Sequence, residues 1–194
     1  KLGDEAQQLM VVGSIKIDTD FAARPGERDK IKDEVGDVIK SRPLWAAAST
    51  HPGEEKLVID AYLALRERGL ETRLLLAPRH PNRTPEIIQL LQRKGLSVQK
   101  RSESVPLAAN TDVLLIDTLG ELSAFLGLAD AAFIGGSLVP RGGHNPMEAA
   151  AWGCAVITGP HVINFATIVR DMERDGAIRM VADEHQLADR LASV

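Results

Sequence analysis

Four of the five histidines, seven of the sixteen glycines and two arginines lie in five short segments of this 194-residue chain. Guanidinium and imidazole groups can bind an anion or carry a proton, and glycine lets a ligand come close to the backbone. The segments are residues 49–55, 78–81, 117–121, 135–148 and 159–161, and each directly follows a predicted strand. This arrangement is typical of a binding face that several loops build together.

Arg79 and Glu148 are the side chains best suited to a phosphorylated or hydroxyl-bearing ligand. Arg79 lies between two prolines, so its guanidinium is partly fixed and can offer paired donors to a phosphate; a surface ion pair would use it equally well. Asn145-Pro146-Met147-Glu148 opens a predicted helix after two glycines. These residues can cap the helix without a ligand. Alternatively, the helix N-terminus faces an anion and Glu148 accepts hydrogen bonds from sugar hydroxyls.

The glycines and histidines do not match the common phosphate or metal motifs. Gly135-Gly136-Ser137 permits close backbone approach or a simple tight turn, but its spacing differs from G-x-G-x-x-G and no Walker lysine follows. Histidines at 51, 80, 144 and 161 lie in the loops without i, i+4 helical spacing and without clustered cysteine or aspartate. We therefore expect hydrogen-bonding roles for them, no metal ion and no cofactor.

Strands that alternate with helices would bring these loops to one edge of a sheet. Apolar runs predict strands at 9–12, 44–48, 72–77, 97–100, 112–116, 131–134, 155–158 and 178–181. Helices are predicted at 27–40, 54–68, 84–94, 122–126, 146–152 and 164–174, and a capping box at 183–186 opens the last one. Without hairpin signals, this order predicts one α/β domain over residues 1–194, a Rossmann-like parallel sheet with helices on both faces. Ligands of such sheets bind outside the carboxyl ends of the strands.

Composition excludes several classes of protein. The chain is 44% hydrophobic, enough for a packed core, and its single cysteine, Cys154, rules out an internal disulfide framework. A net charge of −4 argues against non-specific nucleic-acid binding, and no nucleic-acid partner is expected. No apolar run approaches the roughly 18 residues that a membrane span needs.

Taken together, the loops resemble those of the bacterial 3-deoxy-D-manno-octulosonic acid (Kdo) transferases. The matching segments are 47–51, 78–81, 117–122, 135–138, 142–148 and 159–161 with Asn164-Phe165. The resemblance implies the GT-B architecture, in which the C-terminal Rossmann-like half binds the nucleotide of the donor, CMP-Kdo. This chain is similar to that half alone. It departs from the family's usual pattern at Ala149, where proline is common, and at Pro52, where an acidic residue is common.

The resemblance also implies roles for individual residues. Arg79 and His80 would meet the donor phosphate and its surroundings. Leu119, Gly120 and Glu121 would line the nucleotide, and Asn145, Pro146, Met147 and Glu148 would hold the CMP ribose and phosphate. Lining roles with weaker support fall to Ser49, Thr50, Gly136, Ser137, His144 and Asn164. Lys16 resembles a family lysine that stabilises charge in the transition state; it can also be a solvated charge beside a strand.

By the same resemblance, the full enzyme would transfer Kdo from CMP-Kdo to the lipid A precursor of lipopolysaccharide, with inversion and without a metal. Its acceptor domain, its catalytic glutamate base and its membrane-associating segment are expected outside this chain. We therefore expect this soluble fragment to be inactive alone, and the full protein to act on the cytoplasmic face of the inner membrane. Two alternatives remain: an epimerase of the same fold that uses a UDP-sugar, and a non-catalytic binding domain.

Overall fold

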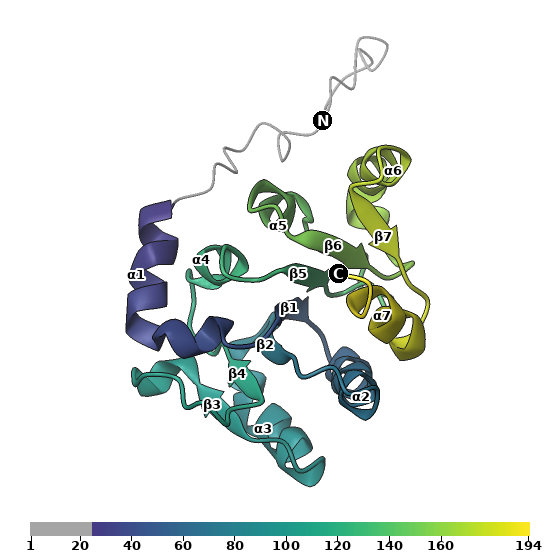
Figure 1. Ribbon diagram of the computed structural model, residues 1–194. Helices are drawn as coiled ribbons and strands as arrows, with labels where there is room; N and C mark the ends of the chain where they lie inside the picture. Colours follow the sequence, from purple (N-terminus) through teal and green to yellow (C-terminus); the bar gives the residue numbers. More distant parts are fainter. Residues whose placement is uncertain (1–24) are drawn as a thin grey trace, which may run out of the picture.

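The computed structural model describes residues 25–194, which form a seven-stranded sheet in which all strands are parallel (Figure 1). The strands are β1 (Leu44–Thr50), β2 (Arg73–Pro78), β3 (Val98–Lys100), β4 (Val113–Leu115), β5 (Ala131–Ile134), β6 (Ala155–Thr158) and β7 (Ile178–Met180). The predicted parallel α/β fold is confirmed. The predicted strand at 9–12 and Lys16 lie outside the described residues.

Helices cover both faces of the sheet (Figure 1). They are α1 (Pro25–Val35), α2 (Glu54–Glu67), α3 (Thr84–Arg93), α4 (Leu122–Leu126), α5 (Met147–Ala151), α6 (Ala166–Arg174) and α7 (Glu184–Leu191). Helices α2, α3 and α7 pack on one face, and α1, α4, α5 and α6 pack on the other. Short 3-10 turns η2 (Asp37–Lys40), η3 (Pro81–Arg83), η4 (Arg101–Glu103) and η5 (Ile163–Phe165) complete the connections.

Strand β1 explains why both faces must be covered. Its residues alternate between the two cores: Leu44, Ala46 and Ala48 join the cluster under α1, α4 and α5, whereas Trp45 and Ala47 join the cluster under α2, α3 and α7. This alternation follows from the two-residue period of a strand. Strands buried on both faces appear as continuous apolar runs, which is why the sequence predicts them well.

The strand order, β3-β4-β2-β1-β5-β6-β7, contains one reversal of direction. From β1 the chain first builds outward through β2, and it later returns to the other side of β1 with β5. The point between β1 and β5 is therefore the topological switch point, where the following loops turn to opposite faces and leave a crevice. The loops after β1 and β5 are residues 51–53 and 135–146, and they lie within two of the segments that the sequence singles out, 49–55 and 135–148.

Two helix predictions differ from the structure in detail. The helix expected over 27–40 ends at Val35, because Gly36 has a φ of 81°, a backbone conformation that terminates helices, and the turn η2 follows. The helix expected over 84–94 ends at Arg93, and Thr84 is its first residue and not a cap, because the Thr84 Oγ1 has no hydrogen-bond partner. At α7 the expected cap is present, since Asp183 Oδ1 accepts from the Gln186 backbone N–H at 2.8 Å.

None of the helices in residues 25–194 combines the length and the apolar character that crossing a membrane requires.

Candidate functional site

The buried carboxylate of Glu54 ties together the loops on the two sides of the switch point. Glu54 lies in the first turn of α2 and is fully buried. Its two oxygens accept hydrogen bonds from the backbone N–H groups of His51 at 2.9 Å, Gly136 at 2.7 Å, Ser137 at 2.8 Å and Leu138 at 2.9 Å. The glycine-rich turn after β5 therefore already surrounds an anion, supplied by the chain itself. The backbone N–H groups of Gly136 and Ser137 are therefore occupied, and these residues fix the loop after β5 at the carboxyl edge of the sheet.

The neighbouring Glu55 fixes the loops after β1 and β2. It is 2% exposed and accepts from Arg83 at 2.5 and 3.2 Å and from the hydroxyl of Thr50 at 3.0 Å. Sequence reasoning missed Glu54, Glu55 and Arg83. Acidic residues in the first turn of a helix are expected from the helix dipole, so Glu54 and Glu55 gave no sign of another role. Their hydrogen-bond partners lie far away in the sequence, and such pairs leave no local sequence pattern.

Three imidazoles meet above the carboxyl ends of β2, β1 and β5. The Nε2 atoms of His51 and His144 are 2.8 Å apart, and their rings are nearly parallel, with centroids 5.1 Å apart and an interplanar angle of 6°. His80 lies edge-on to His51, with ring centroids 5.9 Å apart and planes at 88°. In the pair, one Nε2–H donates to the other Nε2. The structure therefore brings together three of the four histidines that the sequence places in these loops.

Burial and neighbouring cations keep this imidazole pair neutral. Burial is the largest influence on His144 and lowers its pKa to about 4, and the charges of His51 and Arg79 act in the same direction. Burial also lowers the pKa of His51 below its ordinary value, opposed by Glu54 and reinforced by Arg141 and His80. At neutral pH the two rings thus share a single Nε2 proton between them.

Arg79 opens onto a pocket of about 150 Å³ that is lined by the carboxyl ends of β1 and β2 and by the segments that follow β2 and β4. Its lining includes Ser49, Arg79, Leu119 and Gly120, so four predicted site residues meet here. The backbone N–H of Arg79 donates to the carbonyl of Thr50 at 2.9 Å, which fixes the loop. Within the described part of the chain the exposed guanidinium of Arg79 has no hydrogen-bond or ion-pair partner. It is free to meet an anion.

The carboxylate of Glu121 is held by hydrogen bonds within the chain. Arg101 donates to it from Nε at 3.2 Å and from Nη2 at 2.8 Å, and the Thr118 hydroxyl donates as well. Burial would raise the pKa of Glu121, but these hydrogen bonds and the charge of Arg101 hold it below its ordinary value. At this loop a ligand can contact the backbone and the side chain of Leu119, which is 81% exposed.

The segment Asn145–Glu148 both caps a helix and leaves a carboxylate unpaired. Asn145 Oδ1 accepts from the backbone N–H of Met147, the first residue of α5, at 3.0 Å. The capping arrangement is shifted from the predicted one by one residue: the N-cap is Pro146, which was expected as the first helical residue, and Asn145 lies just before it. Glu148 is half-buried, and among residues 25–194 its carboxylate has no hydrogen-bond partner. The cap accounts for Asn145 and leaves Glu148 available to a ligand.

Asn164 fixes the loop before α5 by hydrogen bonds to its backbone. Its backbone N–H donates to the carbonyl of Gly142 at 3.0 Å, and its Nδ2 donates to the carbonyl of Arg141 at 3.3 Å. A Cβ atom on Gly142 would lie 2.4 Å from Asn164 Nδ2, and Gly142 has a φ of +88°. Only glycine fits at this position. Asn164 therefore positions the loop through its side chain.

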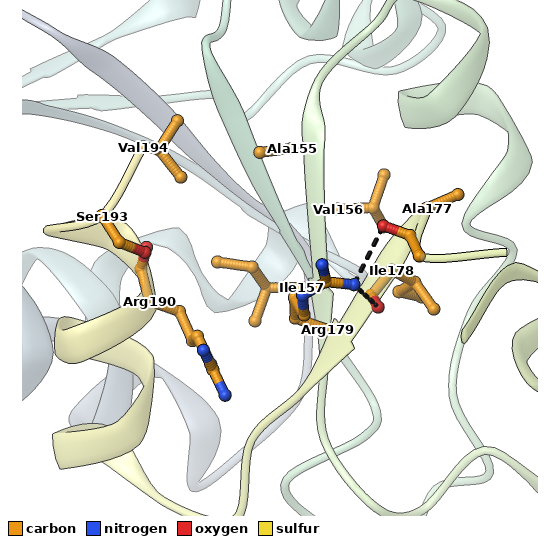
Figure 2. A pocket seen from close by; sticks show the side chains of 10 residues that line it. Ala155, Val156, Ile157, Ala177, Ile178, Arg179, Arg190, Ser193 and Val194 are labelled. Carbon is orange, nitrogen blue, oxygen red and sulfur yellow. Dashed lines mark hydrogen bonds between the residues drawn. The ribbon is translucent and has the colours of Figure 1, made fainter. Parts of the chain in front are cut away.

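Residues 25–194 contain no group of three or more histidine, cysteine, aspartate or glutamate side chains that could hold a metal ion. A separate pocket of about 260 Å³ lies at the opposite edge, between the amino-terminal halves of β6 and β7 and the end of α7 (Figure 2). There Arg179 donates to the carbonyls of Gly176 and Ile178, and no acidic side chain or imidazole lines the pocket. The chemistry-bearing residues are at the carboxyl edge.

A scan against models of known protein families finds no match for this chain. Among curated proteins, a 3-deoxy-D-manno-octulosonic acid transferase of Haemophilus influenzae is 38% identical over 173 residues, which cover 87% of this chain. The transferase of the same name from Bordetella pertussis is 41% identical over 152 residues, 76% of this chain. This chain is homologous to part of the Kdo transferases. It spans 39% of the length of the first relative and 36% of the second.

A solved structure identifies which part of a Kdo transferase the chain resembles. The crystal structure of the C-terminal CMP-Kdo binding domain of WaaA from Acinetobacter baumannii matches with a TM-score of 0.80 and 29% identity. The match covers 87% of this chain and 86% of that domain. The predicted resemblance to the C-terminal donor-binding domain, with its Rossmann-like fold, is thereby confirmed.

Proposed function

We propose that this chain is the donor-binding domain of a Kdo transferase and binds the nucleotide of CMP-Kdo at the carboxyl edge of its sheet. The observation that carries the proposal is the likeness, over most of the chain, to a domain described as CMP-Kdo binding. The switch point between β1 and β5, with unpaired Arg79 and Glu148 on nearby loops, supports the same edge. An epimerase or a non-catalytic domain is not favoured by the named relatives.

Each end of a nucleotide has a suitable group in the proposed site. Arg79 meets the phosphate, because its guanidinium is unpaired and Arg79 lines the pocket at the carboxyl ends of β1, β2 and β4. Leu119 and Gly120 line the nucleotide through backbone and exposed side chain. Glu148 accepts hydrogen bonds from the ribose hydroxyls, and Asn145 holds the start of α5 in place through Met147.

In the full enzyme, this domain serves an inverting transfer. A base outside this chain removes the proton from an acceptor hydroxyl, the oxygen attacks the anomeric carbon of Kdo, and the bond from that carbon to the phosphate oxygen breaks. CMP leaves with the electron pair of that bond, and Arg79 stabilises the charge that develops on the phosphate, without a metal. Lys16, outside the described residues, is a candidate for a second stabilising charge.

The remaining partners belong to the full-length protein. The acceptor is the lipid A precursor, and membrane association at the cytoplasmic face of the inner membrane comes from parts of the enzyme outside this chain. The isolated chain then binds CMP but transfers nothing. Measurable transfer of Kdo by this chain alone would contradict that division of labour.

The proposal is tested by calorimetric titration of the chain with CMP, UMP and AMP in a chelating buffer. We expect binding that is selective for CMP and that weakens about ten-fold in Glu148→Gln, the cost of a hydrogen bond to a charged group. Glu173→Gln, an exposed position on α6, is the matched control. Equal binding of the three nucleotides, preference for UMP, or no binding would each contradict the proposal.

A further inference from the structure

Five cationic or protonatable side chains surround one point of the carboxyl edge. His51 follows β1, Arg79 and His80 follow β2, and Arg141 and His144 follow β5; these three strands are neighbours in the sheet. The imidazoles touch one another, and the charges of Arg79 and Arg141 both act on the pair of His51 and His144. Arg79 alone would suffice for a phosphate. The cluster also includes residues that follow β1 and β5, so it is larger than a phosphate requires.

Within residues 25–194, no acidic side chain forms an ion pair with Arg79 or Arg141. The acids that act on the imidazole pair are Glu54 and Glu55, both buried. Glu54 is bound by four backbone N–H groups, and Glu55 by Arg83 and Thr50. Neither has an oxygen left for Arg79 or Arg141. The exposed guanidinium groups of Arg79 and Arg141 therefore stay available to an anionic ligand.

The proposed donor carries two anionic groups close together. In an octulosonic acid the carboxylate is bonded directly to the anomeric carbon, and in CMP-Kdo that anomeric carbon also bears the phosphate oxygen. A site that binds the phosphate must therefore accommodate a second negative charge directly beside it. A neutral sugar nucleotide would not present that charge.

We propose that His51, His144 and Arg141 form a subsite for the carboxylate of the donor sugar, next to the phosphate at Arg79. This inference rests on the proposed function and adds to it the group that selects an acidic sugar. Arg141 supplies a permanent positive charge. The imidazole pair supplies N–H donors, and its protonation increases when an anion binds beside it. The pair can take up one proton and keep its hydrogen bond, because the ring that donates from Nε2 can also be protonated on Nδ1.

An anion beside the pair favours its protonated form, so binding of the donor is coupled to proton uptake. The charged groups that face the pair are Glu54 and Glu55 from α2, Arg79 and His80 from the loop after β2, and Arg141 from the loop after β5. The pair is neutral at pH 7 in the free chain and gains part of a proton in the complex. The affinity for CMP-Kdo therefore rises as the pH falls below neutrality. The affinity for CMP, which lacks the sugar carboxylate, rises less steeply over the same pH range.

The test compares CMP with freshly prepared CMP-Kdo by calorimetry on the wild-type chain, His144→Gln, Arg141→Gln and the control His185→Gln on α7. We expect CMP-Kdo to bind about ten-fold more tightly than CMP, and both loop variants to lose most of that difference while CMP affinity changes little. Repeating the titration in buffers of different ionisation heat should reveal proton uptake with CMP-Kdo, reduced in His144→Gln. Arg141 is exposed, so its replacement does not endanger folding.

Several outcomes would overturn the carboxylate subsite. Equal affinities for CMP and CMP-Kdo in the wild-type chain would contradict it and leave the proposed function intact. The same holds if both loop variants weaken CMP and CMP-Kdo to the same extent, since that is the result of a structural role. Absence of any CMP binding to the wild-type chain would instead contradict the proposed function itself, and the subsite with it.

Discussion

At the scale of single residues, the described structure depends on carboxylates that serve the protein and not the ligand. Glu54 and Glu55 hold the loops after β1, β2 and β5, and Glu121 is held by Arg101. Glu148 is different, because its carboxylate has no hydrogen-bond partner in residues 25–194. A carboxylate at the carboxyl edge of the sheet can therefore be assigned to ligand binding only when its hydrogen-bond partners within the chain are known.

Glu54→Gln should destabilise the chain strongly. The amide keeps one acceptor oxygen but turns an NH₂ group toward backbone N–H donors, which leaves buried donors unsatisfied. We expect the free energy of unfolding to fall by about 2–4 kcal/mol in urea denaturation. Glu173→Gln, exposed on α6, should change it by less than about 0.5 kcal/mol. Similar losses in the two variants would show that the buried carboxylate is replaceable.

Arg101→Met should alter the response of the chain to acid. In the wild-type chain the pKa of Glu121 lies below its ordinary value, so its ionised form adds stability at neutral pH that is lost as the pH falls through the folded-state pKa. Without Arg101 that pKa rises toward normal. Between about pH 5 and pH 3 the variant should therefore lose less stability than the wild-type chain. Parallel pH profiles of the unfolding midpoint would contradict the role given to Arg101.

At the scale of elements, the glycines of the loop after β5 set how closely it can pack. Gly142→Ala places a Cβ against Asn164 and adds strain at a positive φ, so we expect a lower melting temperature and weaker CMP binding. Gly153→Ala is a matched control, since Gly153 has a φ of +80° with no atom within 4 Å of the added Cβ. Equal effects of both substitutions on CMP affinity would mean that strain alone, and not the loop, is responsible.

Most elements could be predicted from the sequence, because a strand buried on both faces must be apolar throughout and a helix between strands must be amphipathic. The break at Gly36 could not, since a glycine inside a charged segment fits both a helix and its end. The meeting of Ser49, Arg79 and Leu119 followed from parallel topology alone. The partners of Glu54 did not, because the position of β5 beside β1 is not encoded in any local pattern.

At the scale of the whole molecule, a chain with a net charge of −4 presents a locally cationic edge. The acids that would neutralise this edge are buried in hydrogen bonds beneath it, so the field at the loops after β1, β2 and β5 favours an anionic ligand. We expect CMP affinity to fall as ionic strength rises from about 0.05 to 0.5 M, because exposed charges are screened at high salt. Calorimetry over that range checks it, and affinity independent of salt would contradict an electrostatic site.

The central claim, that a cytidine nucleotide binds at the carboxyl edge around the switch point, can be tested most directly by nuclear magnetic resonance. Backbone amide shifts of the ¹⁵N-labelled chain would be followed during a titration with CMP. We expect the largest changes in segments 79–80, 118–121 and 145–148, with little change at 176–179 and 190–194 around the pocket of Figure 2. Changes confined to that opposite edge, or no changes at saturating CMP, would contradict it.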